Sequence, residues 1–184
     1  MCIRDRIDTH IHADHISALN ELNKRTNCIR VMGEKSKSEV IDLRIKDGEK
    51  IKVEEVELQA IYTPGHTDCS YSFLMNDRVF TGDTLLINGS GRTDFQNGNA
   101  YDAYDSIFNK LLKLPEKTLV FPAHDYNGKK FSTIENEKNN NPRLQVSSKE
   151  EYADIMNNLN LANPKMMDVA VPANVKGLTL DNIN

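Results

Sequence analysis

The placement of histidine constrains this chain more than any other feature of its sequence. Three of its five histidines and two aspartates lie in IDTHIHADHI, residues 7–16, and the other two histidines lie in PGHTD and PAHDY. Such segments are typical of loops at strand ends, where a rigid scaffold holds chemically active residues. We therefore expect a fold that brings three distant segments together at one edge of its sheets.

The hydrophobic pattern alternates strands with helices along the chain. Short β-prone runs end at Gly or Pro, while apolar residues spaced three and four apart indicate amphipathic helices. The expected elements are strands at 28–33, 38–44, 56–65 and 118–125, hairpins at 45–53 and 69–83 turning at Asp47-Gly48 and Asn76-Asp77, helices at 13–24, 101–114, 132–142 and 152–159, and an extended tail from 160 onward. This order predicts a single α/β domain spanning residues 1–184.

Composition excludes several classes of function. The formal net charge is −4 and the isoelectric point is near 5.7, so the chain lacks the concentrated basic face that nucleic-acid binding requires. It has no apolar run near the roughly 18 residues that a membrane span needs. Three widely spaced cysteines are typical of a reducing compartment rather than a disulfide framework. We expect a cytoplasmic protein of bacterial origin with no nucleic-acid or membrane partner.

The residue types in the three segments are those of a metal site. The first two histidines of HIHADH are two residues apart, so their side chains point the same way from an extended strand end. His66, Asp83 and His124 follow other strands. Taken singly, a histidine is usually a hydrogen-bonded core residue, and Asp14 would be a helix N-cap. Taken together, these imidazoles and carboxylates favour Zn²⁺ or Fe²⁺ in a site without thiolate ligands.

The motifs THIHADH, PGHT, TGDTLL and PAHDY resemble those of the metallo-β-lactamase superfamily in order and spacing. More narrowly, SGRTDFQNG, PAHDYNG, NPRL and NLNLANPKMMDVAVPAN resemble the persulfide dioxygenases, the ethylmalonic encephalopathy protein family, from about residue 7 to about residue 176. The resemblance implies a metallo-β-lactamase fold, which is an αββα sandwich of two mixed sheets flanked by helices.

The same resemblance implies a catalytic centre with one non-haem Fe²⁺ per chain. The family's two histidines and one carboxylate fall on His10, His66 and Asp83, an arrangement that leaves positions open for substrate and O₂. The remaining motif residues resemble second-metal ligands of two-metal relatives, and in the mono-iron group they orient the ligands and bound water. They are His12, Asp14, His15 and His124.

The substrate implied is glutathione persulfide, which O₂ would oxidise to sulfite and glutathione. Its two carboxylates need partners, and arginine binds carboxylates bidentately. Arg92 in GRTDF and Arg143 in NPRL are the candidates, with Tyr126 as a hydroxyl donor facing the same cleft. A structural pair with Asp94 or Asp125 is the alternative role for Arg92. Relatives of this group also lead us to expect a homodimer.

One alternative is a hydrolase similar to glyoxalase II, in which two zinc ions generate the hydroxide that attacks a thioester. Every ligand for that scheme is present. However, GRTDFQ departs from the pattern of those hydrolases, and the tail lacks their long helical substrate domain.

Another alternative is an inactive, N-terminally truncated fragment. The superfamily places several strands before the first motif, whereas only nine residues precede His10, and MCIRDR is a poor substitute for a buried strand. We expect that early strands are missing, that residues 1–6 are not native, and that this chain expresses poorly or associates. A lost N-terminus could also have carried a mitochondrial signal.

Overall fold

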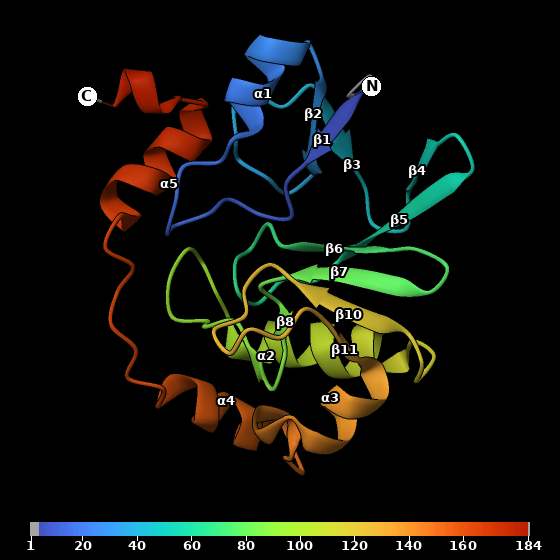
Figure 1. Ribbon diagram of the computed structural model, residues 1–184. Helices are drawn as coiled ribbons and strands as arrows, with labels where there is room; N and C mark the ends of the chain where they lie inside the picture. Colours follow the sequence, from blue (N-terminus) through green and yellow to red (C-terminus); the bar gives the residue numbers. More distant parts are fainter. Residues whose placement is uncertain (1–3, 184) are drawn as a thin grey trace.

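The computed structural model describes residues 4–183 and contains two main β-sheets packed face to face (Figure 1). The smaller sheet is parallel and has the order β1-β2-β3, comprising β1 (Asp5–Ile7), β2 (Ile29–Gly33) and β3 (Leu43–Ile45). The larger sheet has the order β11-β10-β7-β6-β5-β4, comprising β4 (Lys50–Val53), β5 (Val56–Tyr62), β6 (Tyr71–Leu74), β7 (Arg78–Gly82), β10 (Leu119–Pro122) and β11 (Ser132–Thr133). Its neighbours are antiparallel except for the pair β10 and β7. A short hairpin of β8 (Leu85–Leu86) and β9 (Gly89–Ser90) precedes the first helix on the larger sheet.

Helices cover the outer face of each sheet (Figure 1). The smaller sheet carries α1 (Leu19–Thr26) and α5 (Met167–Lys176). The larger sheet carries α2 (Ala100–Tyr104) with its π-helical continuation Asp105–Lys110, α3 (Ile134–Asn140) and α4 (Lys149–Asn157). Single 3₁₀ turns occur at Leu111–Lys113, Pro142–Leu144 and Leu180–Asn182. Within residues 4–183, every helix is too short or too polar to cross a bilayer.

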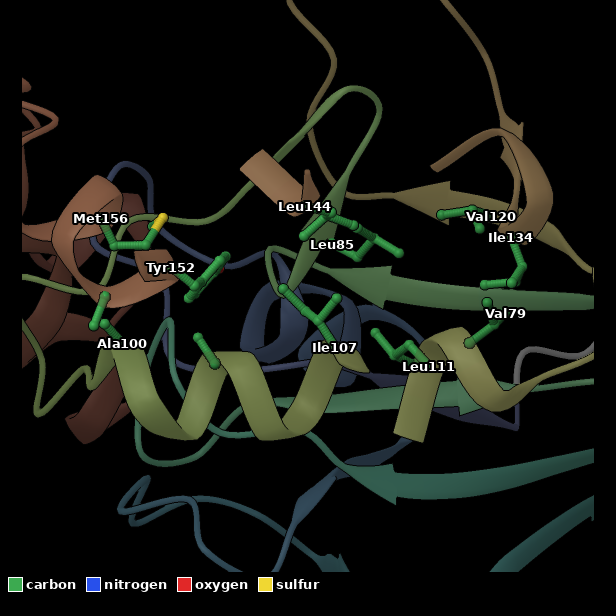
Figure 2. Packing of buried hydrophobic residues seen from close by; sticks show 12 residues of the cluster. Val79, Leu85, Ala100, Ile107, Leu111, Val120, Ile134, Leu144, Tyr152 and Met156 are labelled. Carbon is green, nitrogen blue, oxygen red and sulfur yellow. The ribbon is translucent and has the colours of Figure 1, made fainter. Parts of the chain in front are cut away.

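Three hydrophobic clusters fill the three interfaces between these four layers. Figure 2 shows the first, in which Val79 and Val120 of the larger sheet pack against Ile107, Leu111 and further residues of the helices below it. The second cluster lies between the sheets, and the third joins the smaller sheet to α1 and α5. Strands of the larger sheet such as β6 are therefore buried on both faces.

Most of the expected elements are confirmed. The hairpin turning at Asn76-Asp77 forms from β6 and β7, and β5 and β10 lie within the strands expected at 56–65 and 118–125, whereas β11 occupies two residues at the start of the segment expected to be helical. The helix expected at 101–114 begins at Ala100, where Asn99 caps it by accepting from the N–H groups of Tyr101 and Asp102. The helix expected at 132–142 begins at Ile134 and is capped by Thr133.

The hairpin expected at Asp47-Gly48 is wrong. The chain does turn there, with Gly48 at φ +79°, but the turn carries it from the smaller sheet to the larger one. Ile45 and Ile51 enter the cluster between the sheets from opposite sides, so β3 pairs with β2, whereas β4 pairs with β5. The free energy gained by burying both isoleucines outweighs that of pairing the two adjacent strands with each other. The strand expected at 38–44 is correspondingly short, and only Leu43–Ile45 is extended.

Two further expectations are corrected. Residues 13–18 are irregular, so the helix expected at 13–24 begins only at Leu19. The tail from 160 is not extended throughout, because α5 buries Ala170 and Ala173 despite an internal Pro172. Near the N-terminus, Asp5–Ile7 does form a strand, paired in parallel with β2 because Ile7 packs against the cluster between the sheets. Residues 1–3 of MCIRDR lie outside the described residues.

Candidate metal centre

The structure brings His10, His66 and Asp83 together although they come from three different segments. Nε2 of His10 lies 3.8 Å, and Nε2 of His66 lies 3.6 Å, from the same carboxylate oxygen, Oδ2 of Asp83. One donor atom from each of the three residues lies within 4.8 Å of the other two. Two imidazoles and one carboxylate thus converge on a single point, as the ligands of one metal ion must.

Close backbone packing produces this convergence. His10 follows β1, and Asp83 follows β7 directly after Gly82, whose φ is +53°. A Cβ at Gly82 would lie 2.7 Å from Oγ1 of Thr9, so a side chain there would push the two segments apart. The small residue therefore allows the end of β7 to approach the start of the histidine segment.

Hydrogen bonds orient both imidazoles toward the carboxylate. Nδ1 of His66 lies 2.8 Å from the carbonyl oxygen of Arg92, and Nδ1 of His10 lies 2.9 Å from Oγ1 of Thr9. With Nδ1 occupied, each ring offers Nε2 to the shared point. This is how metal-binding histidines are usually held, so these residues fit a bound metal ion.

The other motif residues form a second group beside the first. His12, Asp14 and His15 also have donor atoms within 4.8 Å of one another. His124 joins the two groups, since its Nδ1 lies 2.7 Å from Oδ1 of Asp83 and its Nε2 lies 3.1 Å from Oδ2 of Asp14. Nδ1 of His12 is buried without a hydrogen-bond partner. Asp14 is not a helix N-cap, because α1 starts after Ala18.

The environment shifts the pKa values of His10 and His12 in one direction and that of His124 in the other. Burial holds the pKa of His10 well below its ordinary value, with neighbouring imidazoles adding to the effect, and burial also lowers the pKa of His12. These rings are therefore neutral, the form that binds metals. By contrast, the hydrogen bond to Asp83 raises the pKa of His124 to about 9.

In the metal-free chain, His124 is expected to make stability depend on pH. Its folded pKa of about 9 exceeds its ordinary value of 6.5, so the stabilisation is complete below about pH 6.5 and is lost as the pH rises through 9. The difference in unfolding free energy between the chain and H124N should therefore shrink over that range, measured by urea denaturation in chelator. A difference that stays constant with pH would contradict this prediction.

A cavity of about 510 Å³ opens over the two groups. His66, Asp83, His124 and Asp14 line its base. Its walls come mainly from the hairpin of β8 and β9 with the loop after it, from the loop after β10, from the 3₁₀ turn at Pro142–Leu144 and from the segment between α4 and α5, which runs along one side of the molecule (Figure 1). The wall residues are Ala13, Leu86, Ser90, Gly91, Arg92, Phe95, Tyr126, Arg143, Leu161, Ala162 and Pro164.

Arg92 is engaged in structural contacts. Its Nε and Nη2 donate to both oxygens of Asp94 at 2.6 and 2.5 Å, as in the alternative considered from the sequence. Its Nη1 donates to the carbonyl of Ala162, 2.6 Å away, and Nη2 also reaches that of Leu161. Asp125, the other suggested partner, accepts instead from the N–H groups of residues 127 and 129.

Arg143 and Tyr126 both line the cavity, but Arg143 is half-buried and Tyr126 is exposed. Arg143 donates to the carbonyl of Ser90, burial lowers its pKa, and among the described residues no carboxylate pairs with it. Tyr126 is 84% exposed, and its ring is parallel to that of His124 at a centroid distance of 6.1 Å. The cavity therefore contains one arginine without a carboxylate partner and one exposed phenol.

Two amide side chains that the sequence analysis missed hold the histidine segment. Asn174 donates to the carbonyls of His12 and His15, and Gln96 donates to that of Ile11. The sequence contains only a weak indication of this role: Gln96 and Asn174 are polar amides within motifs already singled out, GRTDFQNG and DVAVPAN.

Comparisons with known proteins identify the family and the fold. The family model described as "Metallo-beta-lactamase superfamily" matches residues 33–124. The chain is 44% identical over 173 residues to the mitochondrial persulfide dioxygenase ETHE1 of Homo sapiens, covering 92% of this chain and 67% of the human protein. The crystal structure of ETHE1 from Myxococcus xanthus superposes with a TM-score of 0.92 at 47% identity, covering 95% of this chain and 77% of that one. A hydroxyacylglutathione hydrolase of Buchnera aphidicola is 36% identical over 119 residues, covering 64% of this chain and 46% of the hydrolase.

Proposed function

This chain belongs to the persulfide dioxygenases of the metallo-β-lactamase superfamily, and we propose that it is an Fe²⁺ enzyme converting glutathione persulfide, O₂ and one water molecule to sulfite and glutathione. The observation that carries the proposal is the triad of His10, His66 and Asp83 beneath an open cavity. Two histidines and one carboxylate with free positions are the ligand set of non-haem Fe²⁺ oxygenases. When bound, iron supplies redox capacity and open coordination positions.

The chain's own residues position the reactants around that ion. The Nδ1 contacts of His10 and His66 keep both Nε2 atoms turned toward Asp83. His124 orients the carboxylate from its other oxygen. We assign His12, Asp14 and His15 the same kind of role, which is to orient ligands and bound water around the centre. Phe95 and Leu161 give the cavity apolar walls beside the polar groups at the metal centre.

Arg143 is our principal candidate for binding a carboxylate of the glutathione moiety. It lines the cavity without a carboxylate partner, whereas the guanidinium of Arg92 already binds Asp94. A cation whose charge is partly buried gains from an anionic ligand. We keep Arg92 as a weaker candidate and Tyr126 as a hydroxyl donor at the rim of the cavity.

R143Q is expected to raise KM for glutathione persulfide by about 10-fold or more, the usual cost of losing a charge-assisted hydrogen bond, while kcat changes much less. O₂ uptake at varied substrate concentration measures both constants. R25Q, on the exposed face of α1 where Arg25 pairs with Glu21, is the matched control. An unchanged KM in R143Q would remove this residue from substrate recognition.

The group His12, Asp14 and His15 favours one rival, a hydrolase with two zinc ions similar to the hydroxyacylglutathione hydrolases. Metal analysis under anaerobic conditions, followed by O₂ uptake and sulfite assay with glutathione persulfide, decides between them. About one iron per chain with sulfite production supports the dioxygenase. Two zinc ions with thioesterase turnover would contradict it.

We also propose a cellular location for the enzyme. Cys28 and Cys69 are buried free thiols, which supports a reducing compartment such as the cytoplasm. The human relative is named mitochondrial, so a location in that organelle is the alternative. A homodimer stays a prediction.

A further inference from the structure

The segment that carries three of the histidines lacks regular structure of its own. Residues 8–18, here called the histidine loop, connect β1 to α1 without forming helix or strand. A loop must satisfy its backbone polar groups by other means, and side chains are the usual partners. This loop must be held in one conformation if it is to position metal ligands.

One side chain from the far end of the chain supplies three of its hydrogen bonds. Nδ2 of Asn174, in α5, donates to the carbonyl oxygens of His12 and His15, both at 2.9 Å. Oδ1 of the same amide accepts from the N–H of Ser17, also at 2.9 Å. A single amide thus spans six consecutive residues of the histidine loop.

The helix that carries Asn174 is docked independently of this side chain. The N–H of Glu39 donates to the carbonyl of Val175 at 2.8 Å, and Oγ of Ser38 donates to the carbonyl of Asn174. Val171 and Val175 also pack into the third hydrophobic cluster. Removing the amide should therefore leave α5 in place and free only the histidine loop.

Asparagine is well suited to this position chemically. The contacts require two N–H donors for two carbonyls and one oxygen acceptor, and a neutral side-chain amide provides both. Aspartate has nearly the same shape but lacks the donors, so it would place a carboxylate oxygen against two carbonyls.

We propose that Asn174 is a positioning residue, which fixes the histidine loop against the metal centre from the C-terminal helix. It acts through the backbone on either side of Asp14, whose carboxylate reaches His124 at 3.1 Å. Gln96 holds the start of the loop in the same way, at the carbonyl of Ile11. The inference rests on the proposed function only in assuming that these residues bind a metal ion.

The test compares N174D and N174A with the parent chain in two measurements that involve neither O₂ nor persulfide. Chelator competition gives the affinity for Fe²⁺ and for Zn²⁺, and hydrogen exchange of the metal-free chain gives the protection of the loop amides. N157D, which makes the same chemical change on the exposed end of α4, is the control.

We expect N174D to bind metal about 10-fold more weakly, in the range usual for lost supporting contacts around a metal site. Protection of the Ser17 N–H should persist in N174D, which retains the acceptor, and should fall in N174A. The urea midpoint of metal-free N174D should stay close to that of the parent, because the docking contacts of α5 remain.

Parental metal affinity and parental exchange in both variants would overturn the proposal, as would an N174D variant whose loss of affinity merely follows global unfolding. If N174A does not fold, the isosteric N174D still decides. A parent chain that binds metal but lacks dioxygenase activity would instead contradict the proposed function and leave this inference standing.

Discussion

D83N is expected to lose its metal ion and, with it, essentially all turnover. Oδ2 of Asp83 is the common partner of the Nε2 atoms of His10 and His66, and Oδ1 binds His124, so one carboxylate organises three imidazoles. An amide removes the negative charge and one acceptor. Since loss of a supporting contact alone costs about 10- to 100-fold in metal affinity, loss of a ligand should exceed about 100-fold.

Metal content after dialysis and O₂ uptake with glutathione persulfide measure this result. D77N, on the exposed turn between β6 and β7 where Asp77 pairs only with Arg78, serves as control and should match the parent. A D83N variant that retains stoichiometric metal and turnover would show that the centre lies elsewhere.

The largest stability effect is expected at Glu137, which is completely buried. One carboxyl oxygen accepts from Ser132 and Asn136, and the other accepts from the N–H of Asn88 and from Nδ2 of Asn141, both at 2.8 Å. This network ties α3 to the turn between β8 and β9. E137L would leave several buried donors unpaired, each costing about 1–3 kcal/mol.

We therefore expect E137L to lower the unfolding free energy by about 3 kcal/mol or more. For a chain of this size that corresponds to a fall in Tm of roughly 6–12 °C, seen by thermal denaturation of the metal-free chain. E135L, on the exposed side of the same helix, should change Tm little. Equal effects of the two substitutions would mean that the buried network is not stabilising.

The candidate metal centre could be proposed from sequence because its residue types have few other uses in such numbers. Histidines and aspartates at several strand ends indicate a metal, and the structure places six of the seven motif residues in two adjoining groups that His124 joins. The assignment of His10 rather than His12 to the first group could not be predicted from sequence spacing alone. In the fold, Nε2 of His10 lies 3.8 Å from Oδ2 of Asp83, whereas His12 groups with Asp14 and His15.

The parts that sequence patterns missed depend on contacts between distant segments. The Asp47-Gly48 turn is local and was expected, but which sheet β4 joins depends on the burial of Ile45 and Ile51 across the interface. Likewise Pro172 argued against a helix, yet Val171 and Val175 gain enough by packing on the smaller sheet to outweigh it. Tertiary burial exceeded local preference in both cases.

The separation of the ligands along the chain bears on when the centre can assemble. His10 follows the parallel strand β1, whereas His66, Asp83 and His124 follow strands of the other sheet, so no short peptide contains the ligand set. Contacts between segments this far apart in the chain form late in folding, because the entropy of the intervening chain must be lost before those contacts stabilise the fold. We therefore expect metal to bind the group of His10, His66 and Asp83 only after the two sheets have packed. A metal ion that binds after folding slows unfolding and leaves the folding rate nearly unchanged.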